Sequence, residues 1–424
     1  MTTDRVVRTP ALGRGAGQPD QGEHNLRVVA DTIRRADPAG ISRVELTQAT
    51  GLASQTITNV VRRLLTNQIV VEGGVRSTGP GKPRTLVRLN ADGAYAFGVH
   101  VDPLVVDVIL MDLRGTILAR ADHAAPDDEE PSTTLDLLAT TMDGLVERTG
   151  IDRGRLAGVG VAAPGPIDLA TGTLIDPPLL PHWHGTPLSQ ELQRRTGLAV
   201  AVRKDVAAAA IGEMWARTHV DTASFLFCYL GTGTGMAATV NGTLHEGSSG
   251  NAGEIGHWPH AGVGPRCAAC GQHHLGYATA PASWCAEAVA LGLMTAPALE
   301  HPLPREVAEG VRQLAGLASA GDPQARGIFE RAGHALGSAL ADMSDLFDVP
   351  EVVLGGPYWE LVGPMMGDAV TAQVTRLPVL SSLRPVATRT AQHGRDCSAI
   401  GAASLVWHRM LGGLPALTAV RPGG

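Results

Sequence analysis

Along the first 90 residues, the apolar positions recur at helical spacing and then change to short extended runs. A first helix is predicted over 25–36, where the residues on one face are Leu26, Val29, Ala30 and Ile33. A second is predicted up to Thr50, with Ser42 as N-cap and Glu45 completing a capping box. After a tight turn at 51–53, Ser54 is predicted to cap a third helix that ends near Asn67 and buries Ile57, Val60, Val61, Leu64 and Leu65. This order is typical of a helix-turn-helix.

The third predicted helix has a polar face suited to DNA. Short polar side chains at the start of such a helix fit base edges in the major groove, and arginines fit phosphate. The candidate DNA-binding residues in and next to this motif are Arg43, Ser54, Gln55, Thr56, Asn59, Arg62 and Arg63. The alternative is an ordinary helical hairpin with a solvated polar face.

The segment after this helix has the pattern of a wing. Residues 68–90 form two short β runs around a glycine-rich basic tip that contains the sequence GPGKPR. Lys82 and Arg84 stand there in an extended segment, a form that fits the narrow minor groove. The recognition helix and the basic wing together favour DNA binding over the helical hairpin.

From Ala96 onward, apolar strands alternate with helical stretches, and glycine-rich turns often separate them. Such an order predicts a two-lobed α/β body with a ligand cleft between the lobes. Near its start, residues 98–115 read as a β-hairpin whose turn is Asp102-Pro103-Leu104. The turn is notable because proline has no N–H to donate.

Composition supports a large protein with two unlike parts. The 424 residues suggest roughly three domain-sized units, and 44% are hydrophobic, enough for a large core. No apolar run approaches the ~18 residues of a membrane span, and five cysteines in so long a chain predict no disulfide scaffold. Residues 1–90 contain 13 basic and 7 acidic residues, whereas the rest contain 21 and 34. This asymmetry indicates a basic module that meets a polyanion, attached to an acidic body.

Four segments of the body resemble the ROK family of bacterial sugar kinases and sugar-responsive regulators. They are GVGVAAPGPID (158–168), LGTGTG (230–235), GNAGEIGH (250–257) and VVLGGP (352–357), and the resemblance extends from about Asn25 to Leu411. It implies an N-terminal winged helix-turn-helix followed by a two-lobed, actin-like, ROK kinase-like α/β body. The regulators end their winged module in a basic hook, which GPGKPR matches with Lys82 in place of arginine.

The resemblance also implies domain boundaries. We expect a flexible segment over 1–22 and a winged helix-turn-helix over 23–90. The first α/β lobe is expected over 91–204 with 395–424, and the second over 205–394 with the ligand and zinc sites.

The residues that phosphoryl transfer needs are incomplete. Family kinases grip ATP phosphates with glycines and a hydroxyl in the first hairpin, where this chain has Pro103 and Leu104. Asp205 stands at the position of the family's catalytic base and is interpreted as vestigial, and Lys204 replaces an asparagine that binds a sugar hydroxyl. Lys204 either pairs with the adjacent carboxylate, holds an acidic ligand group, or belongs to a drifted loop. We therefore expect no enzyme activity, because phosphoryl transfer depends on positioning the phosphate.

Ligand and metal positions follow in the 250–280 region. By resemblance, Glu254 and His257 contact the sugar beside Lys204 and Asp205, although Tyr277 replaces a further sugar-binding glutamate. His257 also matches a zinc ligand, and with Cys267 and Cys270 it forms a three-ligand set for a structural Zn²⁺. The expected fourth ligand is His274, with His273 as the alternative. The other interpretation is a cysteine pair that has lost its metal.

These observations predict a sequence-specific transcriptional regulator, with repression as the expected mode. Its effector would be a sugar or a sugar derivative, and Lys204 and Tyr277 favour an acidic or phosphorylated sugar, or a non-sugar metabolite, over a neutral hexose. The alternatives are an active sugar kinase with an added DNA module and a regulator controlled by a protein partner. We expect a homodimer or homotetramer on a palindromic operator, no membrane association, and a cytoplasmic location, at the nucleoid when bound to DNA.

Overall fold

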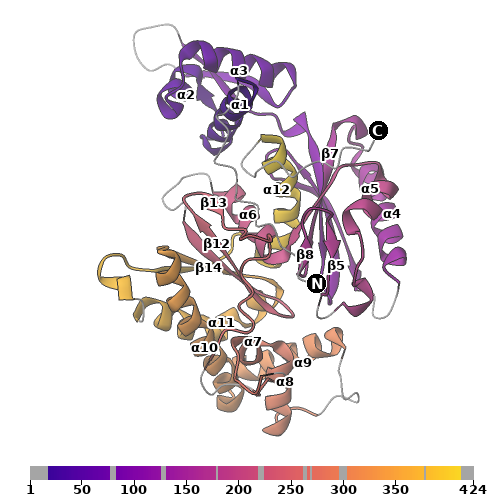
Figure 1. Cartoon of the computed structure of the whole chain (residues 1–424), viewed down its shortest axis with the longest axis vertical. Coiled ribbons are helices and arrows are strands. Elements are labelled where there is room, and N and C mark those ends of the chain that lie inside the picture. The colour runs from indigo at the N-terminus through magenta and orange to yellow at the C-terminus, as the bar shows by residue number, and fades with distance from the viewer. Residues whose placement is uncertain are drawn as a thin grey trace, which may run out of the picture. The chain divides into compact units, whose positions relative to one another are not determined.

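The computed structural model describes residues 18–76, 83–125, 130–177, 180–217, 224–260, 265–267, 270–295, 303–376 and 379–411 (Figure 1). The chain divides into an N-terminal unit up to Leu89 and a larger body that begins at Asn90. Each is described separately below.

The N-terminal unit consists of three helices and a small sheet. The helices are α1 (Gln18–Arg35), α2 (Arg43–Thr50) and α3 (Ser54–Thr66). The sheet has the order β1-β3-β2, with β1 (Ile41–Ser42), β3 (Arg84–Leu89) and β2 (Val70–Arg76). Its core consists of apolar residues from all three helices and the sheet, among them Val29, Ile33, Leu46, Ile57, Val61, Leu64 and Val87. The predicted winged helix-turn-helix arrangement is confirmed.

The helix ends agree with the local sequence at one helix and differ at two. Both hydrogen bonds of the capping box between Ser42 and Glu45 are present. The prediction that Ser54 is an N-cap is wrong: the cap is Ala53, and Ser54 is already helical, because the chain leaves its extended conformation at Ala53. Helix α1 begins at Gln18, inside the segment predicted to be flexible. Residues 18–24 are mostly polar and add no apolar periodicity by which a helix could be recognised.

The wing is the antiparallel pair β2–β3. Its register runs from Val70 opposite Leu89 to Arg76 opposite Arg84, with an irregularity between Glu72 and Val75. Gly74 lies there at a φ of 77°, which favours glycine. The predicted basic tip over 77–82, including Lys82, lies outside the described residues.

The first sheet of the body has the strand order β10-β7-β4-β5-β6. These strands are β4 (Tyr95–Val101), β5 (Val105–Asp112), β6 (Ile117–Ala124), β7 (Leu156–Ala163) and β10 (Val200–Lys204). Strand β4 pairs antiparallel with β5 and parallel with β7. Helices α4 (Pro131–Thr149) and α5 (Leu188–Thr196) share an apolar core with one face of this sheet (Figure 1). The short strands β8 (Ile167–Asp168) and β9 (Thr173–Leu174) form a separate hairpin.

The second sheet has the order β13-β12-β11-β14-β15. Its strands are β11 (Phe225–Leu230), β12 (Thr234–Val240), β13 (Thr243–Leu244), β14 (Glu351–Gly355) and β15 (Ala387–Thr390). Alternate residues of β11 face opposite sides: Leu226 and Cys228 join one apolar core, and Phe225 and Phe227 join another. The first core is completed by α7 (Leu275–Thr279), α8 (Pro281–Ala290), α9 (Pro304–Ser319), α10 (Pro323–Phe347) and α11 (Pro357–Arg376). The second is completed by α6 (Asp205–Ala216) and α12 (Cys397–Leu411).

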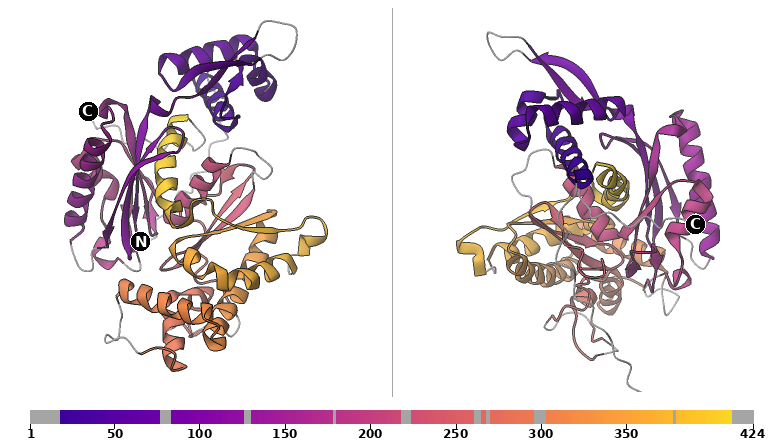
Figure 2. Two further views of the ribbon diagram at one scale, coloured as in Figure 1. Left: turned by 180° about the vertical axis from the view of Figure 1, so that it is seen from behind. Right: turned by 45° about the horizontal axis from the view of Figure 1, so that its top comes forward.

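Helix α12 connects the two sheets of the body, lying between the first sheet and α6 (Figures 1 and 2). A Cβ added at Gly160 of β7 would lie 1.7 Å from the carbonyl oxygen of Ala402 in α12. A Cβ added at Gly401 would lie 1.9 Å from the carbonyl oxygen of Ala208 in α6. Only glycine permits backbones to approach so closely, so α12 packs directly on both neighbours. The predicted two-lobed α/β body is confirmed.

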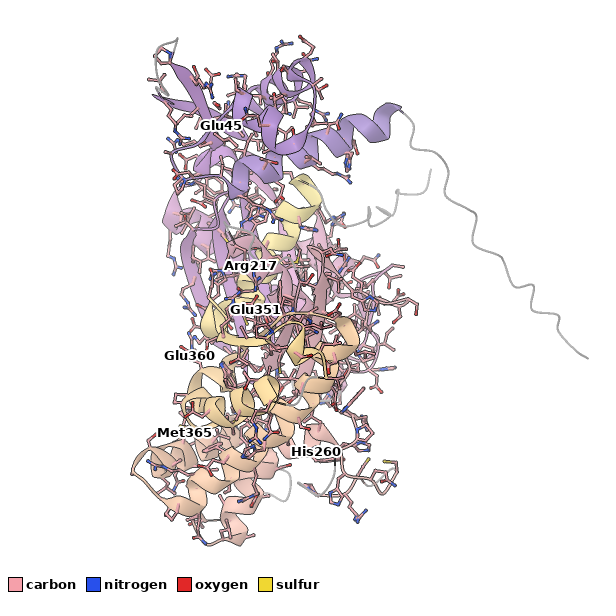
Figure 3. All side chains as sticks on the ribbon, turned by 90° about the vertical axis from the view of Figure 1, so that its left-hand side faces the viewer. Glu45, Arg217, His260, Glu351, Glu360 and Met365 are labelled. Carbon is pink, nitrogen blue, oxygen red and sulfur yellow. The ribbon has the colours of Figure 1, made fainter. Side chains whose placement is uncertain are left out.

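An ion-pair network links α6 to the second sheet. The guanidinium of Arg217 lies 2.8 Å from a carboxylate oxygen of Glu351 (Figure 3). Arg389 of β15 pairs with both Glu351 and Glu213, and the Glu213 side chain is 1% exposed. Because each buried carboxylate has a cationic partner, the network holds the second sheet against α6.

Candidate functional site

The recognition-helix surface is defined here as the exposed polar face of α3. Gln55, Asn59, Arg62 and Arg63 are exposed there, and the Gln55 side-chain amide donates a hydrogen bond to Asn59 Oδ1 at 3.2 Å. The opposite face of α3 is buried through Ile57, Val60, Val61 and Leu64, whereas Leu65 is half-buried. The amphipathic pattern therefore leaves polar and basic side chains exposed on one surface. Of the other candidates, Ser54 is exposed and Thr56 is half-buried.

Two arginines near this surface are held by carboxylates of the same unit. Arg43 at the start of α2 lies 2.7 Å from Glu72 of the wing, and Arg76 of the wing lies 3.1 Å from Glu45. These pairs fix the wing against α2. Arg84, the described member of the predicted basic hook, is half-buried opposite Arg76 on β3.

The turn between β4 and β5 is built around its own aspartate. Asp102 Oδ1 accepts a hydrogen bond from the Leu104 backbone N–H at 2.8 Å. The Asp102 N–H in turn donates to the Val105 carbonyl at 3.0 Å. Pro103 has no N–H, and the Leu104 side chain packs against the core of the second sheet. The turn therefore presents a carboxylate, a proline ring and an apolar side chain, with the Leu104 N–H already bonded.

Three buried polar residues surround this turn: His100, Asp107 and Tyr229. The Tyr229 hydroxyl lies 3.4 Å from His100 Nε2, and Asp107 Oδ2 lies 3.8 Å from His100 Nδ1. Burial raises the pKa of Asp102 to about 6, although His100 opposes the shift. For His100 burial acts to lower the pKa, but the hydrogen bond to the Asp107 carboxylate and the charges of Asp102 and Asp205 raise the pKa overall.

The ligand cavity, as we use the term, is the space of about 130 Å³ beside this turn. The residues that line it are Pro103, Pro164, Gly165, Lys204, Asp205, Val206, Tyr229, Thr232, Gly233, Thr234, Gly235 and Glu254. Three of the four predicted ligand-binding residues are thus brought together, and His257 is not among the lining residues. Threonines and glycines of the LGTGTG segment (230–235), here called the glycine loop, form one wall between β11 and β12.

Lys204 and Asp205 stand where β10 ends and α6 begins. Asp205 Oδ1 accepts from the Val206 N–H at 2.7 Å, and burial raises the pKa of Asp205. The Lys204 ammonium lies 2.5 Å from Glu254 Oε1, so its partner is the carboxylate of the 250–257 loop. Adjacency in sequence predicts Asp205 as one possible partner of Lys204. The fold instead brings Glu254, 50 positions away in sequence, to the ammonium.

The 250–257 loop has a second attachment. The Ile167 N–H donates to Asn251 Oδ1 at 2.8 Å, and Asn251 Nδ2 donates to the Ile167 carbonyl at 2.8 Å. Gly250 packs against Leu169 so closely that an added Cβ would lie 2.0 Å from its Cδ1. The loop that carries Glu254 is thus fastened to the β8 hairpin.

Beyond the loop, His257, Cys267 and His274 form a possible metal-binding group. Their ligand atoms all lie within 4.8 Å of one another, and Cys270 Sγ lies 2.9 Å from His274 Nε2. His274 Nδ1 is buried and has no hydrogen-bond partner. Buried polar atoms are normally paired, so this nitrogen indicates a site that takes a further component such as a metal ion. Two thiols and two imidazoles are a donor set that zinc prefers, so the residues fit this metal. Of the two histidines considered as fourth ligand, His274 is the one in this group.

Sequence reasoning missed several residues of this region. His100, Asp102, Asp107 and Tyr229 interrupt apolar strand runs, a signal that could have marked them as a buried polar cluster. Asn251 carried no such signal, because its partner is backbone in a distant segment.

Together, the fold and the cavity define a two-lobed α/β protein of the actin-like kind that carries a winged helix-turn-helix unit. The model of the ROK family matches residues 98–409, and the chain belongs to this family. No helix in the described ranges is both long and apolar enough to cross a membrane.

Individual relatives agree with the family. The xylose repressor of Bacillus spizizenii is 24% identical over 91% of this chain and 96% of its own length. The crystal structure of a ROK family transcriptional regulator, a homolog of the E. coli MLC protein, superposes with a TM-score of 0.73. It is 20% identical and covers 91% of this chain and 96% of its own. A ROK family glucokinase from Streptomyces griseus, solved with glucose and AMPPNP, is 26% identical with a TM-score of 0.60. It covers 74% of this chain and 99% of its own.

Proposed function

We propose that this protein is a sequence-specific DNA-binding transcriptional regulator, acting as a repressor, whose ligand cavity binds a sugar or sugar-derived effector. The observation that carries the proposal is the combination of exposed polar and basic side chains on α3 with a β4–β5 turn in which the Leu104 N–H is already hydrogen-bonded to Asp102. The relative named as a xylose repressor matches 91% of the chain, which supports the same class.

DNA contact is assigned to α3 and the wing. Gln55, Thr56 and Asn59 would read base edges, and Arg62 and Arg63 would bind phosphate. Ser54 and Arg43 would contact the backbone at the edge of the motif, and Arg43 would exchange its pairing with Glu72 for phosphate. Lys82 and Arg84 would enter the minor groove as part of the wing.

Catalysis of phosphoryl transfer is not part of the proposal. Catalysis of that reaction depends on groups that hold and neutralise the phosphate. At the β4–β5 turn the Leu104 N–H is taken by Asp102, and an ionised Asp102 would repel phosphate oxygens. By resemblance, Asp205 stands at the base position, where it would be vestigial. An active kinase is nevertheless the second candidate, because the S. griseus glucokinase shares the body fold.

The proposed role of zinc is structural. His257, Cys267, Cys270 and His274 would hold the ion, which would supply a fixed charge and cross-link the loop beyond Glu254. His257 is thereby oriented next to the ligand cavity's loop. Effector binding in the cavity that Lys204 and Glu254 line would then shift the loop, by its differential affinity for two loop positions.

The operator follows from the motif. A helix-turn-helix protein binds as a dimer to half-sites spaced by whole helical turns, so we propose a homodimer or a dimer of dimers on a palindromic site in the cytoplasm.

DNase footprinting on promoter fragments tests the proposal, with ATP turnover measured in parallel over a panel of sugars. A protected palindrome without sugar-dependent ATP turnover is expected. Sugar-dependent ATP consumption with no protected site would establish the kinase instead. A protected site that no small molecule alters would favour control by a protein partner.

A further inference from the structure

The ligand cavity contains a buried ammonium group whose one described partner is accessible from solvent. The Lys204 side chain is 4% exposed, whereas Glu254, which lies 2.5 Å from its Nζ, is 65% exposed. The stem of Lys204 is held in place, because a Cβ added to Gly165 would lie 3.0 Å from its Cδ. The ammonium is therefore fixed at the cavity wall, and the carboxylate that neutralises it can move into water.

The chemistry of an ammonium limits what can face it. It donates three hydrogen bonds and accepts none, whereas the amide of an asparagine both donates and accepts. A ligand that approaches Lys204 must offer an acceptor in place of the Glu254 carboxylate. A neutral hydroxyl in place of Glu254 would leave Asp205 as the remaining nearby anion for the buried ammonium, and loss of the direct ion pair is costly. A carboxylate or phosphate oxygen replaces the lost pairing in kind.

The other walls fit the polyol part of such a ligand. Asp205 offers carboxylate oxygens to hydroxyl groups, and Thr232 adds a hydroxyl from the glycine loop. Thr234 is already bonded to Thr279 at 2.6 Å, so it shapes the wall instead. The cavity of about 130 Å³ has room for one small polar molecule.

We propose that the effector is an acidic sugar derivative of monosaccharide size, whose carboxylate or phosphate binds Lys204 and displaces Glu254. This inference rests on the proposed function, because it names the ligand class of the same cavity. Displacement of Glu254 removes the ion pair that ties the 250–257 loop to Lys204, while Asn251 and backbone hydrogen bonds at Gly253 and Gly256 keep the loop attached elsewhere. Effector binding is thus converted into a change at this loop.

Isothermal titration calorimetry on the full chain without DNA tests the proposal. The probes are glucose, galactose and mannose, each compared with its uronate, its aldonate and its 6-phosphate. We expect at least one acidic probe to bind about tenfold or more tightly than its neutral parent. The uronate and aldonate arms against the phosphate arm identify which anion is used.

Three variants separate recognition from folding. Lys204→Asn should reduce the preference for the acidic probe about tenfold or more, and Lys204→Arg should retain most of it. Glu254→Gln removes the competing charge and should tighten binding of the acidic probe, so the proposal stays testable if Lys204→Asn fails to fold.

Three outcomes would overturn the proposal: neutral parents that bind as tightly as every acidic probe, no binding of any acidic probe at about 10 mM, or an acid preference unchanged in Lys204→Asn. Because the titration uses no DNA, its failure is distinct from failure of the regulator assignment, which is read from DNA binding alone.

Discussion

Replacing Arg62 and Arg63 by alanine should flatten the salt dependence of DNA binding. Both side chains are exposed on α3 and have no ion pair among the residues that the structure describes. Each phosphate contact contributes about 0.9 to the slope of log affinity against log salt, so losing two contacts lowers the slope by about 1.8. Between about 50 and about 200 mM salt, the affinity of the double variant should therefore fall about tenfold less than that of the wild type.

The assay is fluorescence anisotropy titration of an operator fragment across this salt range. Arg153→Ala is the matched control, because that arginine is 56% exposed on the body and pairs with Asp143. Its salt slope should equal that of the wild type. A double variant with an unchanged slope would refute the assignment of these arginines to phosphate. A slope equal to that of the wild type, together with a loss of preference between DNA sequences, would assign the two arginines to base contacts.

Three further predictions concern the body. Protein purified without a histidine tag should contain stoichiometric zinc by elemental analysis, and Cys267→Ser should lose it; a metal-free wild type contradicts the zinc site. Burial raises the pKa of Asp102 to about 6, so the folded protein binds the Asp102 proton more tightly than the unfolded chain does. The contribution of Asp102 to the free energy of unfolding therefore falls as pH rises from about 4 to about 6. Denaturant unfolding should therefore show Asp102→Asn gaining stability relative to the wild type across this window, and a constant difference would argue against a buried carboxylate. Gly401→Ala should lower the thermal unfolding midpoint, because the added Cβ would clash with the Ala208 carbonyl. Such overpacking lowers the free energy of unfolding by about 1–3 kcal/mol or more. An unchanged midpoint would contradict the close packing of α12.

Local features of the fold could be predicted from the sequence because their causes are local. The capping box at Ser42 depends on residues three positions apart, and the amphipathic pattern of α3 fixes which side is buried. The β4–β5 hairpin follows from two apolar runs around Asp102-Pro103-Leu104. The predicted N-cap of α3 lies one residue too late. Serine favours the N-cap position in general, but here the turn before α3 places Ala53 at that position.

The candidate site depended on distant contacts that no local pattern contains. The resemblance to the ROK family identified Lys204, Asp205 and Glu254, and the structure brings these three to one cavity. The pairing of Lys204 with Glu254 could not be predicted, since it requires the path of the intervening chain. The same is true of Asn251, whose partners are backbone atoms of Ile167.

The most direct test of the central claim compares the affinity of the full chain for a fragment of its own promoter region with that for a shuffled fragment of equal length. Specific regulators bind their operators about a thousandfold or more tightly than other DNA at physiological salt. We predict such a ratio in an anisotropy titration of this protein. Equal affinity for the two fragments, across promoter fragments that tile the whole region, would contradict it.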